Sequence, residues 1–297
     1  YLDPGCRRDA GRARSGGTVR MTPVTELAIV IVSYNARDDL QACLSQLRDH
    51  PPRAAHQTIV VDNASTDGSA AAARTYGPPV EVLDAGGNLG FARATNVGIA
   101  ATHSRLVLLL NSDALPPTGA IDRLIEILDA HDDVAVTGPR LIDGRGRLEI
   151  SSGPMLSPLA ELWQKSLVRA HAHGVPGLAG LAERQARRER LVDWVSGACL
   201  LVRRADADAV GGLDERFFLY TEDVDFCASI RALGRHVLFT PGVEVVHRRG
   251  RSGRHAQAAT AVAYRRSHLA FYQKHHPRWH PVLRTYLRIR GLLPPDH

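Results

Sequence analysis

The sequence predicts an α/β fold with a mostly parallel central sheet flanked by helices. Three observations support this fold class. Short runs of branched apolar residues alternate with helical patterns over residues 27–128. These runs lack the polar alternation of a strand with one wet face, as expected for strands buried on both faces. Polar residues follow each run at its carboxyl end, where sheets of this kind bind their ligands.

Four expected strands and their helices follow one another in regular order. The first strand spans 27–32, and the helix after it carries its apolar residues on one face: Leu40, Cys43, Leu44 and Leu47. The next three expected strands span 58–61, 80–83 and 106–110. A helix with an apolar face over 121–128 ends this half of the chain.

Polar clusters occur where these strands end. They are Ser33, Tyr34 and Asn35; Asp62 and Asn63; Asn88 in a glycine-rich loop; and Asn111, Ser112 and Asp113. Any one of them is more often a turn or cap residue than a ligand. Four clusters at the same rim of a parallel sheet favour a binding site. Asp113 follows five apolar residues, so its charge is best explained by a ligand.

The regular alternation ends near residue 140. Residues 143–146 predict a hairpin turn, and 153–190 predict a mobile excursion over the sheet, with some helix around 159–171. A single strand is expected over 192–204. Two short strands are expected around a Pro-Gly pair, at 237–239 and 243–247.

An acidic segment separates these late strands. Thr221 is expected to cap a helix that has Glu222 and Asp223 in its first turn and ends at Gly234. Asp225 follows in the same turn. Acids at a helix start complement the helix dipole, which is sufficient for Glu222 alone. The cluster of three favours a reactive site.

The two ends of the chain differ from its middle. Residues 1–22 are polar and rich in Gly and Arg, and we expect a disordered extension there. Residues 23–250 form the expected folded domain, and 251–297 a basic helical tail. The tail interleaves aromatic and basic residues, which fits either an anionic membrane surface or a helix packed on the domain.

Composition narrows the function classes. The net charge is +6, but no nucleic-acid-binding motif accompanies it, so we expect no nucleic-acid partner. The four cysteines have no metal or redox spacing, and no apolar run approaches a membrane span. We therefore expect a cytoplasmic protein whose tail can contact the inner face of the membrane.

Familiar nucleotide-binding and hydrolase motifs are absent from the sequence. Residues that could bind a metal ion and act as a general base are present. There is no G-x-G-x-x-G, Walker loop, G-x-S-x-G or H-E-x-x-H. Asp113 and His247 stand at strand ends and could hold a divalent cation that also binds a diphosphate. A separate carboxylate, Asp223, could take a proton from an attacking hydroxyl.

The order and spacing of these segments are similar to those of family 2 glycosyltransferases with the GT-A fold. The resemblance covers about residues 26–250 and is closest to rhamnosyltransferase-type members that use a deoxythymidine diphosphate sugar. The matching segments are Val30–Asn35, Val61–Gly68, Asn88–Ala92 with Asn96, Leu110–Asp113, Asp193–Ala198 and Phe217–Asp225. Singly they are weak, but together they are specific.

The resemblance implies a role for each matching residue. Asp223 would be the general base, and Asp113 with His247 would hold Mg²⁺ or Mn²⁺. The acceptor side would comprise Trp194, Ser196, Gly197, Glu222 and Asp225. The nucleotide sugar would be bound by Ser33, Tyr34, Asn35, Asp62, Asn63, Asn88, Gly90, Phe91, Asn96, Asn111 and Ser112. Asn111 replaces the usual first acid of the family's D-x-D motif, so metal affinity is expected to be weaker.

The implied function is that of an inverting glycosyltransferase. The donor would be a dTDP- or UDP-sugar, with L-rhamnose from dTDP-rhamnose preferred. The acceptor would be a hydroxyl of a glycan or polyprenyl-linked molecule in cell-envelope polysaccharide synthesis. One alternative is a non-catalytic protein that binds nucleotide sugars or glycans on the same fold. A nucleotidyltransferase is disfavoured, because the first loop lacks the Gly, Arg and Lys residues that bind a triphosphate.

Overall fold

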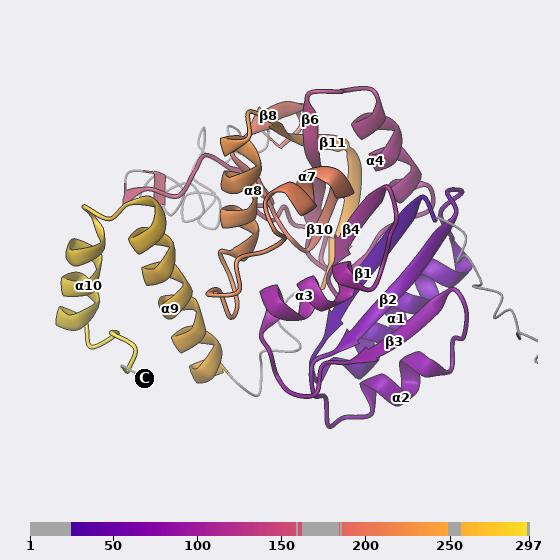
Figure 1. Ribbon diagram of the computed structural model, residues 1–297, viewed down its shortest axis with the longest axis horizontal. Helices are drawn as coiled ribbons and strands as arrows, with labels where there is room; N and C mark the ends of the chain where they lie inside the picture. Colours follow the sequence, from indigo (N-terminus) through magenta and orange to yellow (C-terminus); the bar gives the residue numbers. More distant parts are fainter. Residues whose placement is uncertain (1–24, 159, 162–183, 185, 249–256, 296–297) are drawn as a thin grey trace, which may run out of the picture.

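The computed structural model describes residues 25–158, 160–161, 184, 186–248 and 257–295 (Figure 1). Its strands are β1 Leu27–Ser33, β2 His56–Asp62, β3 Val80–Asp84, β4 Leu106–Leu110, β5 Ala114–Leu115, β6 Val134–Ile142, β7 Ser152–Gly153, β8 Arg190–Val192, β9 Trp194–Val195, β10 Cys199–Arg203 and β11 His236–His247. Its helices are α1 Arg37–Asp49, α2 Ser69–Arg74, α3 Phe91–Ala100, α4 Ala120–Asp129, α7 Arg204–Ala209, α8 Glu222–Ala232, α9 Gln257–His275 and α10 His280–Ile289.

The central sheet has the order β3-β2-β1-β4-β10-β6-β11-β5, and β8 pairs with β11. β1, β2, β3 and β4 are parallel to one another, and β11 is parallel to β6. β10 runs antiparallel to β4 and β6. The expected α/β class with a mostly parallel sheet is therefore confirmed. The strand ends after β1, β2 and β4 meet at one rim, as parallel pairing requires.

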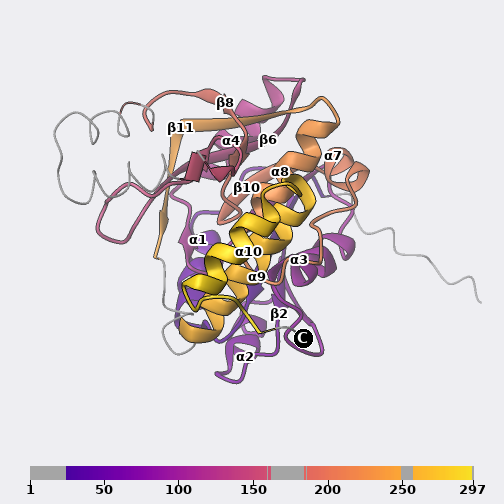
Figure 2. The same ribbon diagram turned by 90° about the vertical axis from the view of Figure 1, so that its left-hand side faces the viewer.

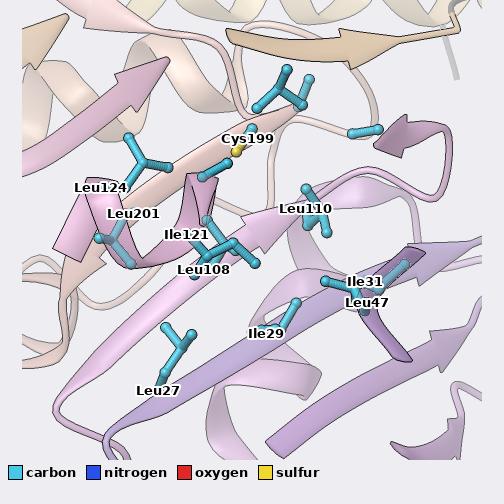
Figure 3. Close-up of a cluster of buried hydrophobic side chains, with 14 of the residues drawn as sticks. Leu27, Ile29, Ile31, Leu47, Leu108, Leu110, Ile121, Leu124, Cys199 and Leu201 are labelled. Atoms are coloured by element: carbon cyan, nitrogen blue, oxygen red, sulfur yellow. The ribbon is translucent and has the colours of Figure 1, made fainter. Parts of the chain in front are cut away.

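Helices cover both faces of the sheet. Alternate side chains of β1 point to opposite faces, so Ile29 and Ile31 pack with the apolar faces of α1 and α4, while Val30 packs with α3, α7 and α8. Figure 3 shows part of the first cluster, where Leu108 and Leu201 lie beside Ile121 of α4. The second cluster also includes Phe271 of α9. This places the C-terminal helices on the same side as α8.

Four expectations about elements were wrong. The strand expected at 192–204 is divided into β8, β9 and β10, because a bend at Asp193 separates β8 from β9 and a turn at Gly197 and Ala198 separates β9 from β10. The two strands expected at 237–239 and 243–247 are one strand, β11, which absorbs Pro241 and Gly242 as an irregularity against β6.

Strand β6 was not expected, because its Gly138-Pro139 pair suggests a turn. A Cβ on Gly138 would lie 2.6 Å from Cβ of Val195. The glycine is needed for close approach between strands, not for a turn.

The fourth concerns the cap of α8. Thr221 occupies the N-cap position, but its side chain makes no capping hydrogen bond and its φ is +66°. The expected end of this helix is confirmed, since Gly234 follows with φ +80°.

The tail is helical, as expected. α9 packs through Phe271 and Tyr272, and α10 lies against α9 (Figures 1 and 2). Among the described helices, none combines the length and apolar character that crossing a bilayer requires. The extension at 1–22, the helix around 159–171 beyond residue 161 and the boundary at 250 lie outside the described residues.

Candidate functional site

The loops after β1 and β2 are joined by hydrogen bonds at the rim. Asn35 Oδ1 accepts from the Thr66 backbone N–H at 2.8 Å, and Asp62 Oδ2 accepts from the Ser65 N–H at 3.2 Å. Ser33 Oγ and Asp62 Oδ1 are buried and have no hydrogen-bond partner among the described residues. Unpaired buried polar atoms are rare and call for an explanation. A bound nucleotide would supply it.

Asn63 and Asn88 shape the loop after β3. Asn63 Nδ2 donates to Asn88 Oδ1 at 2.9 Å, and the Leu89 N–H donates to Asn63 Oδ1 at 2.8 Å. The Gly90 N–H donates to Asn88 Oδ1 at 3.2 Å. Both amides are therefore engaged in holding the loop. Asn63 and Asn88 would therefore act on a nucleotide sugar indirectly, by positioning the loop that contacts it.

Gly90 and Phe91 connect this loop to the acidic segment. The Phe91 N–H donates to the Phe218 carbonyl at 2.7 Å. A Cβ on Gly90, whose φ is +81°, would lie 2.5 Å from the same oxygen. Tyr220 and Thr221 then adopt φ of +69° and +66°, which non-glycine residues rarely do and which is often seen at functional sites. The turn at Tyr220 and Thr221 thus starts α8 close to the loop that contains Gly90.

Asn96, Tyr34 and Ser112, which were expected to bind the nucleotide sugar, differ in exposure and in hydrogen bonding. Asn96 binds the backbone N–H and carbonyl of Leu213, so its amide is used as a structural clamp away from the rim loops. Tyr34 is exposed at the rim, and Ser112 is buried.

A cluster of carboxylates around one histidine lies beside the rim, and we call it the candidate metal end. His247 Nε2 lies 3.1 Å from Asp113 Oδ1 and 3.3 Å from Asn111 Nδ2. His247 Nδ1 donates to Glu149 Oε2 at 2.9 Å. β11 brings His247 there by pairing with β5, where it lies opposite Ala114. Asp113, Glu149 and His247 are all buried. Glu149 was not expected from the sequence.

The charge balance at this end is unusual. Burial lowers the pKa of His247, but its contacts with Asp113 and Glu149 outweigh burial and raise the pKa to about 9. The imidazole is therefore held between two carboxylates as a cation when no metal is bound. A metal would displace its Nε2 proton.

The residues fit a divalent cation with few protein ligands. Two ligand atoms of an octahedral Mg²⁺ with bonds of about 2.1 Å are about 3 Å apart, which matches Asp113 Oδ1 and His247 Nε2. Glu149 on Nδ1 would fix the tautomer that leaves Nε2 open. In the described residues no three His, Cys, Asp or Glu side chains form a metal-binding group. Diphosphate and water would complete the coordination, as is usual for Mg²⁺.

The acids of α8 have separate environments. Asp223 Oδ2 accepts from the Gly197 N–H at 2.9 Å, and Oδ1 accepts from the Val224 N–H at 2.8 Å. A Cβ on Gly197 would lie 3.3 Å from Cβ of Asp223, so the turn after β9 is in close contact with this acid. These two backbone N–H groups thus help to fix the position of the Asp223 carboxylate.

Glu222 is buried beside Asp223. Burial, and then the charge of Asp223, raise the pKa of Glu222 well above its usual value. Its Oε2 has no hydrogen-bond partner. Burial and the neighbouring Asp223 thus both favour the protonated form of Glu222.

Asp225 binds the C-terminal helix. Its Oδ2 accepts from Lys274 Nζ at 2.9 Å, and its Oδ1 from His275 Nε2 at 2.6 Å. Only 1% of Asp225 is exposed. We expected this residue on the acceptor side, but its two oxygens are used to anchor α9. Its acceptor role has no support in the geometry.

The other expected acceptor residues form the turn that faces Asp223. Trp194 is buried and donates from Nε1 to the Pro154 carbonyl at 2.9 Å, so it packs rather than lines a surface. Ser196 Oγ accepts from the Ala198 N–H at 3.3 Å. Ser196 and Gly197 thus position Asp223 through the turn.

Comparison with known proteins identifies the family. The family model "Glycosyl transferase family 2" matches residues 28–182. An N-acetylglucosaminyl-diphospho-decaprenol L-rhamnosyltransferase of Mycobacterium tuberculosis is 31% identical over 283 residues, covering 88% of this chain and 89% of the relative. This chain therefore belongs to glycosyl transferase family 2 and is a glycosyltransferase.

Solved structures show the same GT-A fold. A mannosyltransferase of Pyrobaculum calidifontis, in complex with GDP-Man and Mn²⁺, aligns with TM-score 0.58 and 19% identity over 88% of this chain and 69% of that one. GalNAc-T7 with UDP, GalNAc and Mn²⁺ aligns with TM-score 0.56 and 14% identity over 75% of this chain and 43% of that one. The fold predicted from the sequence is confirmed.

Proposed function

We propose that this chain is an inverting rhamnosyltransferase. It moves L-rhamnose from dTDP-rhamnose to a hydroxyl of a polyprenyl-linked glycan in cell-envelope polysaccharide synthesis. The observation that carries the proposal is the junction of Gly90 and Phe91 with Phe218. This contact places the glycine-rich loop after β3, where we expect the nucleotide sugar, directly beside the segment that carries Asp223. The name of the mycobacterial relative supports the sugar and the lipid-linked acceptor.

The nucleotide would lie along the loops after β1, β2 and β3. Asp62 Oδ1 is a buried, unpaired acceptor, which suits the N–H of a thymine or uracil ring. Ser33 Oγ offers a second unpaired group nearby. Asn35 holds the two loops together. These residues would set the affinity for the donor rather than the rate of transfer.

The diphosphate would lie at the candidate metal end. Asp113 and His247 would hold Mg²⁺ or Mn²⁺, which offsets the negative charge that develops on the departing diphosphate. Glu149 would fix the imidazole of His247 in the required orientation. Asn111 adds an amide instead of a second carboxylate. The site thus has one negative charge fewer, and it should bind the cation weakly without the donor.

Transfer would occur in a single displacement. The Asp223 carboxylate takes the proton of the acceptor hydroxyl, whose oxygen bonds to the anomeric carbon while the bond from that carbon to the diphosphate breaks. The electron pair of the broken bond leaves with the nucleotide diphosphate. The Gly197 N–H keeps the carboxylate in place. Because attack and departure are on opposite faces, the anomeric configuration inverts.

A thermal-shift screen of nucleotide diphosphate sugars tests the donor. The full chain with Mg²⁺ or Mn²⁺ should show its largest rise in melting temperature with dTDP-rhamnose, a smaller one with UDP-sugars and none with GDP-mannose. The dTDP-rhamnose shift should shrink when EDTA is added. A preference for GDP-mannose would contradict the proposal. A specific shift without transfer to any of a broad acceptor panel would favour a non-catalytic binding protein.

A further inference from the structure

Helix α10 has two apolar faces, and only one of them is covered. Leu287 is buried and Leu283 is partly buried and packs with the core cluster that contains Phe271 of α9. On the other side lie Val282, Tyr286 and Ile289, which we call the outer stripe. They are 55%, 53% and 80% exposed. A helix that only packs on a domain needs one apolar stripe. The outer stripe therefore has no role in holding α10 to the fold.

The outer stripe is one continuous surface. Its residues follow the i, i+4, i+7 spacing of a single helix face. Pro281 and Thr285 of α10 are exposed beside them on the same side of the helix. Figure 2 shows α10 in front of α9, at the outer side of this end of the molecule. Exposed Trp279 precedes the helix.

Basic residues flank the outer stripe. Arg284 and Arg288 lie on one flank of α10, and Arg290 follows on the other; all three are exposed. Residues 257–295 contain seven Lys and Arg and no Asp or Glu. An apolar stripe between long basic side chains is typical of a helix that lies in the plane of an anionic membrane interface.

Charge also distinguishes a membrane from a second copy of the chain. A two-fold dimer would place this face against itself, which brings two sets of arginines together. Such contact between like charges is unfavourable. An anionic lipid surface instead offers an apolar layer for Ile289 and phosphate groups for the arginines.

We propose that the outer stripe and its arginines are a docking surface for the anionic lipid bilayer that carries the acceptor. The surface deepens the proposed function, and it rests on that function for the lipid-linked nature of the acceptor. α9 joins the two sites, because Lys274 and His275 bind Asp225, two residues after Asp223. Docking through α10 would therefore hold the base at a fixed distance from the membrane surface.

Vesicle co-sedimentation of the full chain tests the surface without donor or acceptor. Binding is expected with vesicles that contain phosphatidylglycerol, and it should weaken with phosphatidylcholine alone or with added salt. The double substitution V282D/I289D should weaken binding by about tenfold or more. The double substitution R284E/R288E should weaken it by roughly tenfold on anionic vesicles only. None of these four residues belongs to the proposed catalytic site.

Matched controls lie on the core domain. Leu191 in β8 is 55% exposed like Val282, and Arg145 is an exposed arginine in a turn. L191D and R145E should leave vesicle binding unchanged. Absence of vesicle binding, or equal binding by V282D/I289D, would overturn the proposal. So would a dimer in light scattering that V282D/I289D dissociates, since the surface would then belong to a second copy.

The test separates the surface from the proposed function. Transfer to a water-soluble, short-chain acceptor should be equal in the wild-type chain and V282D/I289D. Transfer to the acceptor embedded in anionic vesicles should fall in the variant. Vesicle binding by a chain that transfers no rhamnose would retain the docking surface and reject the proposed function.

Discussion

The proposed nucleotide side, formed by the loops after β1, β2 and β3, and the proposed carboxylate side, with Asp113, Asp223 and Asp225, hold their polar groups in different ways. On the nucleotide side, Asn35, Asn63 and Asn88 bind loop N–H groups and one another. On the carboxylate side, Asp113 and Asp225 face charged partners, His247 and Lys274. The first side is built mainly of amide contacts that shape loops. The second is built of charges whose partners can change during the reaction.

This difference predicts which property each variant should lose. Changes on the nucleotide side should alter donor binding, whereas changes on the carboxylate side should alter transfer, metal affinity or the attachment of α9. Asp223 and Asp225, two residues apart, show the contrast within one helical turn. Backbone N–H groups of Gly197 and Val224 bind the Asp223 carboxylate, whereas Lys274 and His275 bind Asp225 in a buried ion pair.

The largest expected effect is that of Asp223→Asn. Transfer should fall by about 10²–10⁴-fold, because the amide cannot take the acceptor proton. Donor binding should be unchanged in a thermal-shift titration, since the amide oxygen can still accept from the Gly197 N–H. Asn35→Ala provides the opposite case, with weaker donor binding and a smaller loss of kcat. Full activity of Asp223→Asn would refute its role as the base.

Asp225→Ala should mainly destabilise the fold. The change leaves Lys274 and His275 without their buried partner, which should cost about 3 kcal/mol in the free energy of unfolding. Asp214→Asn is the matched control, because Asp214 binds the same lysine in a more exposed position and should cost about 1 kcal/mol or less. Denaturant titration gives both values. An unchanged stability together with a raised KM for acceptor would restore the acceptor role of Asp225.

Glu149→Gln should lower metal affinity by about 10–100-fold. The amide cannot orient the His247 imidazole as a carboxylate does, although the ligand atoms themselves remain. Mn²⁺ binding in the presence of nucleotide diphosphate, followed by electron paramagnetic resonance, measures this without turnover. Glu244→Gln, an exposed acid on β11, should have no effect. Equal affinities for wild type and Glu149→Gln would remove Glu149 from the metal site.

The smallest effect concerns pH. The folded-state pKa of His247 is raised to about 9, above an unfolded value of about 6.5. Its stabilisation of the metal-free protein should therefore be complete below pH 6.5 and be lost as pH rises through 9. Melting temperatures measured in EDTA should fall over this range more steeply for wild type than for His247→Gln. Parallel curves would contradict the paired, charged state of His247.

The nucleotide side could be predicted from sequence better than the carboxylate side. Buried strands β1, β2 and β4 reveal themselves as continuous apolar runs, and the rim residues follow directly after them. Glu149 lies 98 positions from His247 in an irregular segment, so no local pattern indicates their contact. Asp225 looks the same in sequence as Asp223, because only the fold of α9, 49 positions away, separates their tasks. β6 was missed because Gly138-Pro139 resembles a turn.

The most direct test is a transfer assay with defined substrates. Purified chain, Mg²⁺ or Mn²⁺, dTDP-rhamnose and a short-chain polyprenyl-diphosphate-linked N-acetylglucosamine are incubated, and the product linkage is determined by NMR. We predict a rhamnosylated acceptor whose anomeric configuration is opposite to that of the donor, and no such product with Asp223→Asn. A product that retains the donor's configuration, or an equal yield from Asp223→Asn, would contradict a single displacement assisted by Asp223.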